Sequence, residues 1–150
     1  MNVVEHRRGP YTISTDKKRL DHSVIHQFLS QESYWAQGRS MDVVKVTIDQ
    51  SLCFGIYDGS QQVGFARVVT DGATFAWLAD VFVLESHRGQ SLGKWLVQCV
   101  VDHPNLGDLK WFLLATRDAQ EFYQQYGGFE TLPASDKWMY RVKRVVESRD

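Results

Sequence analysis

Runs of apolar residues in the middle of this chain are separated by two short Asp-Gly turns, and this pattern predicts an antiparallel meander. The runs are rich in the β-branched and aromatic residues that favour strands, and Asp-Gly between two such runs is a strong hairpin signal. We therefore expect three consecutive strands within residues 51–84, at Leu52 to Tyr57, Gln62 to Val69 and Thr74 to Leu84.

After the meander, the apolar positions recur with the period of an amphipathic helix. The spacing i, i+3, i+4, i+7, i+8 is that of a stripe packed on a core, and it is met by Leu92, Trp95, Leu96, Cys99 and Val100. This helix should start near Gly89. A later stripe of Ala119, Phe122, Tyr123 and Tyr126 predicts a last helix, which the pair Gly127-Gly128 would end by its permissive backbone.

Weaker patterns complete the order of elements. A first strand is expected at Tyr11 to Thr15. Asp21 or Ser23 could cap a helix whose apolar face is Val24, Ile25, Phe28 and Leu29. The other expected elements are a short helix at Met41 to Ile48, a buried strand at Lys110 to Ala115 and a closing strand at Trp138 to Val145. Strands followed by a strand-helix-strand-helix-strand order indicate an α/β (α+β) fold, with a mixed sheet and helices on its faces.

Composition restricts the organisation and the partners. The chain has 150 residues, of which 43% are hydrophobic, so it can bury one core and is expected to form a single domain over 1–150. A formal net charge of -1 argues against a general nucleic-acid coat, which would need a basic excess. No stretch approaches the roughly 20 apolar residues of a membrane span, so we expect a cytoplasmic protein without membrane contact.

The cysteines and histidines show no pattern of a metal site or of a cysteine nucleophile. Cys53 and Cys99 lie within apolar patterns, which favours buried free thiols over a disulfide or a catalytic pair. His22 and His26 are four residues apart, yet no His-Glu-x-x-His signature surrounds them. No metal is predicted.

The segment from Val81 to Lys94 carries the most informative chemistry. An apolar strand breaks into a short loop with Arg88 and Gly89, and a helix follows. Backbone N–H groups at a helix start lack intrahelical partners and lie at the positive end of the helix dipole, so they can hold a diphosphate. The alternative is that Gly89 and Gly93 are only turn and packing glycines.

Two motifs in this order resemble those of the GNAT superfamily of acyl-CoA-dependent N-acyltransferases. The family's R-G-x-G-x-G-type loop is matched by Arg88-Gly89-Gln90-Ser91-Leu92-Gly93, with Ser91 in place of the middle glycine. The family's Tyr-x-x-x-Gly-Phe ending is matched by Tyr123 to Phe129 with one extra glycine. Thr116 stands where the family usually has Asn, and the usual Ala is present as Ala119.

The resemblance implies a mostly antiparallel mixed sheet whose fourth and fifth strands splay apart, with helices on both faces. It also implies acetyl-CoA as cosubstrate. The pantetheine arm would hydrogen-bond to backbone groups of Phe82 and Val83, near Thr116, and the diphosphate would be held by Arg88 and by the loop residues Gly89, Gln90, Ser91, Leu92, Gly93 and Lys94.

The resemblance also assigns the catalytic residues. Tyr123 matches the general acid that protonates the departing thiolate, and a phenol with a pKa of about 10 is protonated at neutral pH. Tyr126 is the alternative tyrosine, with packing as its expected role. Asp80 interrupts an apolar strand, so it is either a general base facing a cleft or one half of a structural ion pair, for instance with Arg67.

The acceptor pocket of this family usually lies under the connection between the first two helices. Tyr34, Trp35 and Arg39 occupy that connection here, and they are candidates for acceptor binding through stacking and bidentate pairing. They could equally anchor the loop or form a dimer interface, which leaves a homodimer open.

The leading hypothesis is an acetyltransferase in which a primary amine, expected to be a small molecule, attacks acetyl-CoA directly in a ternary complex. Two alternatives stay open, namely acetylation of protein lysines or N-termini and a non-catalytic acyl-CoA-binding regulatory module. One fold hosts many functions, so the resemblance alone does not identify the acceptor.

Overall fold

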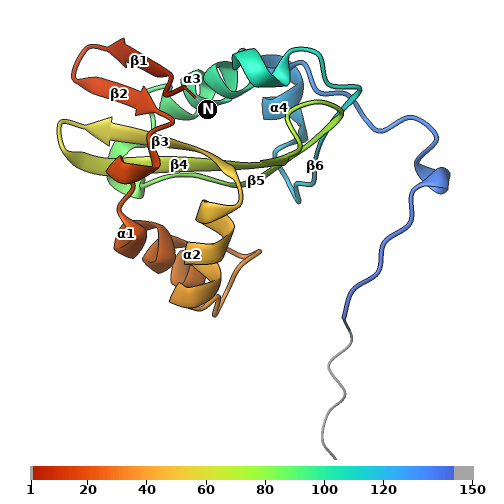
Figure 1. Cartoon of the computed structure of the whole chain (residues 1–150), viewed down its shortest axis with the longest axis horizontal. Helices are drawn as coiled ribbons and strands as arrows, with labels where there is room; N and C mark the ends of the chain where they lie inside the picture. Colours follow the sequence, from red (N-terminus) through yellow and green to blue (C-terminus); the bar gives the residue numbers. More distant parts are fainter. Residues whose placement is uncertain (1, 144–150) are drawn as a thin grey trace, which may run out of the picture.

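The computed structural model of the protein describes residues 2–143 (Figure 1). Its sheet has six strands in the order β1-β2-β3-β4-β5-β6. The strands are β1 (Glu5–Arg8), β2 (Tyr11–Ser14), β3 (Leu52–Asp58), β4 (Gln61–Thr70), β5 (Phe75–Val83) and β6 (Trp111–Leu114). The α-helices are α1 (His22–Gln27), α2 (Met41–Asp49), α3 (Leu92–Val101) and α4 (Gln120–Gly127). A π-helical turn, Phe28–Glu32, continues α1.

The sheet is mixed and mostly antiparallel, as predicted. Strands β1 to β5 pair antiparallel in sequence order, and β6 pairs with β5 in parallel. The meander of β3, β4 and β5 lies at the expected residues. The hairpin of β1 and β2 was not predicted, because every residue of Glu5–Arg8 is exposed and none of them is apolar.

Helices cover both faces of the sheet, which confirms the predicted layers. In Figure 1, α1 and α2 lie on one side of the strands and α3 and α4 on the other. On the first side, the core includes Ile25, Phe28, Val44, Ile48, Phe65 and Phe82. On the second side it includes Phe54, Ile56, Val63, Leu92, Leu96 and Val100. The alternation of side chains along β3 and β4 supplies both cores from the same strands.

Helix α3 begins at Leu92 rather than near Gly89, where the sequence had placed its start. A short 3-10 turn, Glu85–His87, follows β5, and Gly89 then has a φ of 82°. Ser91, the residue before the helix, also has a left-handed backbone, with φ 60° and ψ 21°. Two residues with positive φ reverse the chain before the helix, so the helical period cannot extend back to Gly89.

Helix α4 ends as predicted, at the paired glycines. Gly128 has a φ of 70° and donates its N–H to the carbonyl of Tyr123, and the N–H of Phe129 reaches the same carbonyl at 3.2 Å. A left-handed residue after the last turn is what glycine adopts without steric cost. This end fixes the last turn of the helix that carries Tyr123.

The expected closing strand from Trp138 to Val145 is not formed over residues 138–143, and residues 144–145 lie outside the described part of the chain. The segment leads away from the body of the molecule (Figure 1). Within the described residues, β6 is therefore the last strand of the sheet. Pairing of such a segment depends on a tertiary partner, which the local pattern of side chains does not specify.

Candidate functional site

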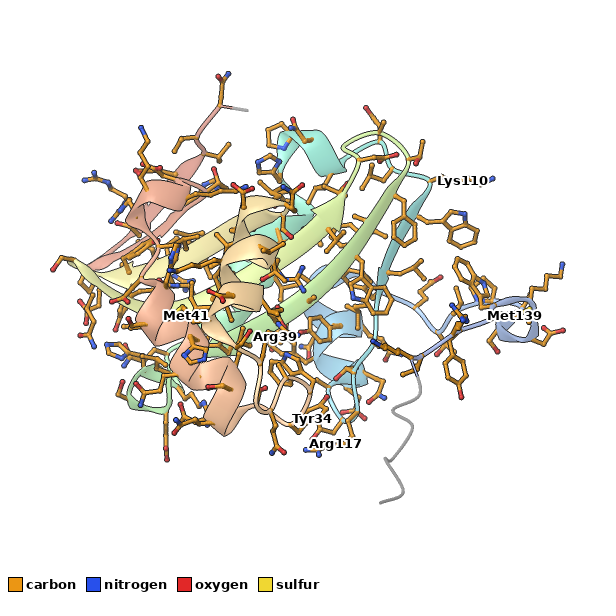
Figure 2. The ribbon with its side chains drawn as sticks, turned by 60° about the horizontal axis from the view of Figure 1, so that its bottom comes forward. Tyr34, Arg39, Met41, Lys110, Arg117 and Met139 are labelled. Carbon is orange, nitrogen blue, oxygen red and sulfur yellow. The ribbon has the colours of Figure 1, made fainter. Side chains whose placement is uncertain are left out.

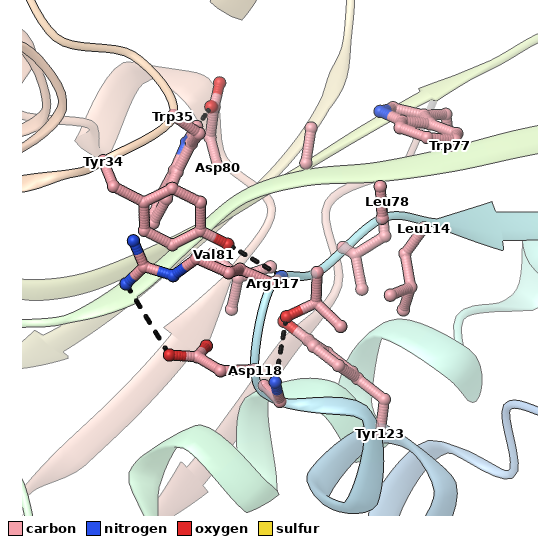
Figure 3. Close-up of a pocket in the computed structure, with 14 residues that line it drawn as sticks. Tyr34, Trp35, Trp77, Leu78, Asp80, Val81, Leu114, Arg117, Asp118 and Tyr123 are labelled. Carbon is pink, nitrogen blue, oxygen red and sulfur yellow. Dashed lines mark hydrogen bonds and ion pairs between the residues drawn. The ribbon is translucent and has the colours of Figure 1, made fainter.

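A cleft opens where β5 and β6 separate. The two strands pair only from Phe75 with Trp111 to Leu78 with Leu114, and β5 then continues alone on this side to Val83. The cleft has a volume of about 430 Å³ (Figure 3). Residues from three parts of the chain line it, among them Tyr34, Trp35, Trp77, Asp80, Leu114, Thr116, Arg117 and Tyr123. The predicted splay between the family's fourth and fifth strands is thus present between β5 and β6.

A β-bulge turns β5 at the point where it leaves β6. Arg67 of β4 pairs with Ala79, whereas Phe65 pairs with Phe82, so β5 has one residue more than β4 in this interval. Asp80 lies in the bulge with a φ of 54°. Aspartate tolerates the left-handed region better than most residues do, and bulges redirect strands and side chains beside active sites.

The carboxylate of Asp80 is buried and fully engaged. Its Oδ2 accepts hydrogen bonds from Arg39 Nη1 and Arg67 Nε, each at 2.8 Å, and its Oδ1 accepts one from Trp35 Nε1 at 2.8 Å. The side chain is only 1% exposed. Burial raises the pKa of Asp80, but the charges and hydrogen bonds of Arg67 and Arg39 outweigh it, and the pKa lies below the usual value of an aspartate.

These contacts favour the ion-pair alternative for Asp80 over the role of general base. A base must accept a proton near neutral pH, and two arginines stabilise the ionised form of this carboxylate. The predicted pairing with Arg67 is present, and Arg39 joins it. Arg39, which the sequence suggested as an acceptor-binding residue, does not line the cleft, and its guanidinium pairs with Asp80 instead.

The connection between α1 and α2 supplies the aromatic wall of the cleft. Tyr34 and Trp35 both line it, as the sequence predicted for acceptor-binding residues, and their rings pack edge to face with 5.1 Å between centroids. Tyr34 Oη accepts the backbone N–H of Arg117 at 3.1 Å. The Arg117 guanidinium lies over the Tyr34 ring, 3.9 Å from its centroid, which is a cation–π contact. Figure 2 shows Tyr34 and Arg117 side by side at the edge of the molecule.

Tyr123 lies on the opposite wall, on the first turns of α4. It is half-buried against the core under the sheet and lines the cleft beside Leu114 and Thr116 (Figure 3). Burial raises the pKa of its phenol to about 12, with a further contribution from Tyr34. The phenol is therefore a proton donor at neutral pH. Tyr126 does not line this cleft; its ring lies 5.0 Å from Lys94 Nζ.

The loop of the predicted diphosphate site lies between the end of β5 and the first turn of α3. The first backbone hydrogen bond of the helix runs from the N–H of Trp95 to the carbonyl of Ser91 at 3.1 Å. The N–H groups of Leu92, Gly93 and Lys94 precede this bond, and such groups can bind an anion. A Cβ added at Gly93 would lie 3.6 Å from the ring of Phe122 in α4. Gly93 therefore also lies in the contact between α3 and α4.

Two neighbours hold this loop on the β2–β3 side. Gln90 accepts a hydrogen bond from the Tyr11 hydroxyl, and His87 Nε2 lies 3.0 Å from Asp58 Oδ2. The Arg88 side chain folds back, with Nε donating to the Val83 carbonyl at 3.1 Å. The loop is therefore shaped by contacts within the protein before any ligand is considered.

The other predicted cofactor residues have clear places. Phe82 is buried, and its ring stacks on Phe28 with 4.0 Å between centroids, so only its backbone could meet a ligand. Val83 ends β5 beyond its last pairing with β6. Thr116 lies in the cleft, where its Oγ1 accepts the N–H of Ala119 at 3.1 Å before α4.

Trp77 and Arg117 line the cleft and were not predicted. Trp77 is 37% exposed, and the alternation along β5 places it on the face opposite the buried Leu78. That alternation was the signal that could have found it. Arg117 had no such signal, because its contact with Tyr34 joins residues far apart in the chain.

Residues 2–143 contain no group of three or more His, Cys, Asp or Glu side chains arranged to hold a metal ion. In the same part of the chain, no helix has the length and apolar character that crossing a membrane requires. Cys53 and Cys99 are free and buried, as predicted.

Comparisons with known proteins agree with this geometry. The sequence model of the acetyltransferase (GNAT) domain matches residues 49–130. A crystal structure from Xanthomonas campestris pv. campestris, whose name proposes a GNAT-family acetyltransferase, has 44% identity and a TM-score of 0.86, covering 89% of this chain and 93% of that one. A structure from Clostridium acetobutylicum with acetyl-CoA has 12% identity and a TM-score of 0.61, covering 88% and 94%, and shows the shared fold.

A curated relative from Gibberella zeae, whose name also proposes an acetyltransferase, is 34% identical over 110 residues. The match covers 61% of this chain and 62% of the relative, so the chain spans somewhat under two thirds of that protein's length. The fold and the open cleft thus define an acetyltransferase-type α/β domain. The chain belongs to the GNAT family, which uses acetyl-CoA as cosubstrate.

Proposed function

We propose that the protein is an N-acetyltransferase that moves the acetyl group of acetyl-CoA to the primary amine of a small molecule. One observation carries the proposal: the cleft between β5 and β6 holds the Tyr123 phenol on one wall and the aromatic side chains of Tyr34 and Trp35 on another. A proton donor thus shares a cavity with a surface suited to an acceptor.

The donor would enter along the splayed strands. Beyond Leu78, the edge of β5 that faces β6 has no strand partner, so backbone groups up to Phe82 and Val83 can pair with the amides of a pantetheine arm. The N–H groups of residues 89–94, together with Arg88, would hold the diphosphate at the start of α3. This orientation brings the thioester toward Tyr123.

In the chemical step, the neutral amine attacks the thioester carbonyl, the new C–N bond forms, and the C–S bond then breaks. The amine loses one proton and the sulfur gains one, so the products are an amide and a free thiol. Tyr123 would donate a hydrogen bond to the sulfur as negative charge develops on it. With a pKa of about 12, the phenol is a weaker acid than a thiol, whose pKa is about 8.5, so the phenolate left by full proton transfer would be more basic than the departing thiolate. The phenol's proton must therefore be replaced, and the amine proton supplies it.

The walls of the cleft suggest the class of acceptor. Trp77, Tyr34 and Trp35 are 37%, 44% and 40% exposed, and a cavity of about 430 Å³ fits a small molecule. Asp80 is neutralised by its arginines. These features support an amine that carries an apolar or aromatic group. Its neutral form would come from solution, because the contacts of Asp80 disfavour that residue as a base.

Substitution of Tyr123 by Phe tests the assignment. We expect kcat to fall by about a hundredfold, because positioned acid catalysis contributes roughly 10²–10⁴-fold, while the Kd for CoA changes by less than about twofold. The rate is measured as free thiol released from acetyl-CoA with a panel of amines, and product masses identify the acceptor.

The matched control is Tyr126→Phe, on the same helix but outside the cleft, which should retain wild-type turnover. Equal loss of activity in the two variants would contradict a specific role for Tyr123. If the protein binds CoA but turns over none of the amines, the proposal that it is an N-acetyltransferase is wrong, and a binding role without catalysis remains.

A further inference from the structure

The segment after Trp138 exposes large apolar side chains to solvent. Met139, Tyr140 and Val142 are 95%, 91% and 68% exposed, and apolar side chains that are exposed next to one another mark an interaction site more often than singly scattered ones do. Figure 2 shows Met139 on a part of the chain that projects from the body. Trp138, Tyr140 and Val142 alternate with Met139 and two basic residues, which is the pattern of a strand with one apolar face.

The edge of the sheet beside this segment is open. Strand β6 pairs with β5 on one side, and no residue of 2–143 pairs with its other side. An unpaired edge presents N–H and C=O groups that can accept a further strand. β6 itself consists of the apolar residues Trp, Phe, Leu and Leu, without the charges or prolines that usually protect such an edge.

A groove of about 770 Å³ lies along this edge. It is lined mainly by apolar side chains, including Phe75, Trp111, Leu113, Phe129, Leu132 and Pro133. Trp138 occupies one part of it, with its ring edge to face with Trp111 at 5.2 Å between centroids. The segment is therefore anchored at the groove by its first residue, and the rest of the groove is uncovered.

We propose that residues 139–143 of one copy of this chain pair as a strand with the open edge of β6 in a second copy, and that the exchange is mutual. The argument for a second copy is the path of the chain. After the contact with Trp111, the segment leads outward (Figure 1) and places Tyr140 and Val142 in solvent, away from its own groove. A two-fold arrangement places each outward segment on the partner's edge, and this is a common route to dimers.

The register of the alternation defines the docked face. Tyr140 and Val142 would enter the partner's groove, while Trp138 stays in the groove of its own chain and Arg141 and Lys143 stay in solvent. This arrangement buries the two apolar side chains and pairs the backbone of both strands. The burial of apolar side chains and the backbone hydrogen bonds each occur twice in a symmetric dimer.

The docked strand would also border the active-site cleft. The groove and the cleft share Trp77, Leu114, Thr116 and Tyr123 as lining residues. A strand seated in the groove would therefore close one side of the cavity that holds Tyr123. The exchange itself, however, depends only on the edge and the segment, and it stands independently of the reaction proposed above.

The oligomeric state of the full chain tests the exchange. Sedimentation velocity between about 1 and 100 µM should give a dimer for the wild type. Tyr140→Asp places a charge in the apolar groove at both exchanged sites and should weaken the dimer by at least about a hundredfold in Kd. Arg141→Asp is the matched control, with the same new residue on the opposite face, and should remain dimeric.

Hydrogen exchange of the β6 amides supplies a second measurement. Protection of residues 111–114 should be strong in the dimer and lost in Tyr140→Asp, while the amides of β3 and β4 stay protected in both and show that the variant is folded. A monomeric wild type would overturn the proposal, even with protected β6 amides, because the segment would then lie on its own chain. A dimer that persists unchanged in Tyr140→Asp would overturn it as well.

Discussion

At the scale of single residues, two residues beside the cleft and the loop before α3 are among those that adopt a backbone conformation usually left to glycine. Asp80 and Ser91 have φ values of 54° and 60°, and they lie at the two ends of the proposed path of the donor. Asp80 is held there by three hydrogen-bond donors. Ser91 makes no side-chain capping bond to α3, so its backbone strain has no such compensation.

Replacement of Ser91 by glycine should therefore stabilise the protein. The left-handed region costs an L-residue about 1–2 kcal/mol, and the greater freedom of glycine in the unfolded chain offsets part of the gain. We expect the free energy of unfolding to rise by about 0.5–1 kcal/mol, measured by urea denaturation. Ser60→Gly, at an exposed turn residue without a positive φ, should instead be neutral or destabilising. A loss of stability in Ser91→Gly would contradict the inferred backbone strain at Ser91.

At the scale of elements, the end of α4 determines where the tyrosine of the cleft is held. Gly128 closes the helix through its left-handed backbone, and the Tyr123 carbonyl accepts the two N–H groups that follow the last turn. Tyr123 therefore belongs to a turn whose backbone is bonded at both ends. Its N–H also reaches the carbonyl of Ala119 at 3.2 Å.

Substitution of Gly128 by alanine should loosen this end. No atom lies within 4 Å of an added Cβ, so the cost comes from the positive φ alone and should be about 1 kcal/mol. Thermal unfolding measures it, with Gly107→Ala, an open position without a positive φ, as the control. Equal effects at the two positions would refute the argument from backbone conformation.

Elements that depend on neighbouring residues were predictable from the sequence, and those that depend on distant partners were not. The strands of the meander follow from apolar runs between two Asp-Gly turns, and α4 follows from its stripe and its glycines. The β1 hairpin, the bulge at Asp80 and the path of residues 138–143 depend on pairing across the sheet. Nothing in a local window of residues encodes such pairing.

The candidate site divides in the same way. The motifs predicted Tyr123 and the Arg88 to Lys94 loop beside a splayed strand pair. The position of Tyr34 and Trp35 between the first two helices predicted that they border the cleft, which they line. The motifs left open whether Asp80 is a base or an ion-pair partner, because the answer requires the positions of Arg39 and Arg67. Side chains from three separate elements determine that chemistry.

At the scale of the whole molecule, the Asp80 carboxylate joins three parts of the structure. It binds Arg67 of β4, and Trp35 and Arg39 of the connection between α1 and α2, while it belongs to β5 itself. The Asp80 carboxylate therefore links the sheet to the connection between α1 and α2. Loss of its charge would leave two arginine side chains without their partner.

We expect Asp80→Asn to destabilise the fold by about 2–3 kcal/mol at pH 7. This is less than the 3–5 kcal/mol typical of a broken buried pair, because Arg39 and Arg67 keep 21% and 12% of their side chains exposed. Chemical denaturation measures the change. Asp118→Asn, at a carboxylate that is 68% exposed, is the control and should differ little from the wild type.

The pH dependence gives a second readout. The folded pKa of Asp80 is lowered, so its stabilisation is complete above the unfolded value of about 3.9 and is lost as the pH falls through the folded value. The difference in stability between wild type and Asp80→Asn should therefore shrink with acidification below about pH 4. A difference that stays constant down to pH 2 would exclude the ion pairs as its source.

The contacts of the same carboxylate distinguish Trp35 from Tyr34, the two aromatic residues that line the cleft from the connection between α1 and α2. Trp35 is bound to Asp80, so a change of its side chain would disturb the buried charges beneath it. Tyr34 contacts Arg117 from the other wall, and neither side chain takes part in the charge cluster. If the cleft binds the proposed acceptor, relatives with other acceptors are expected to diverge at these two positions first, and a redesign of acceptor preference should begin there.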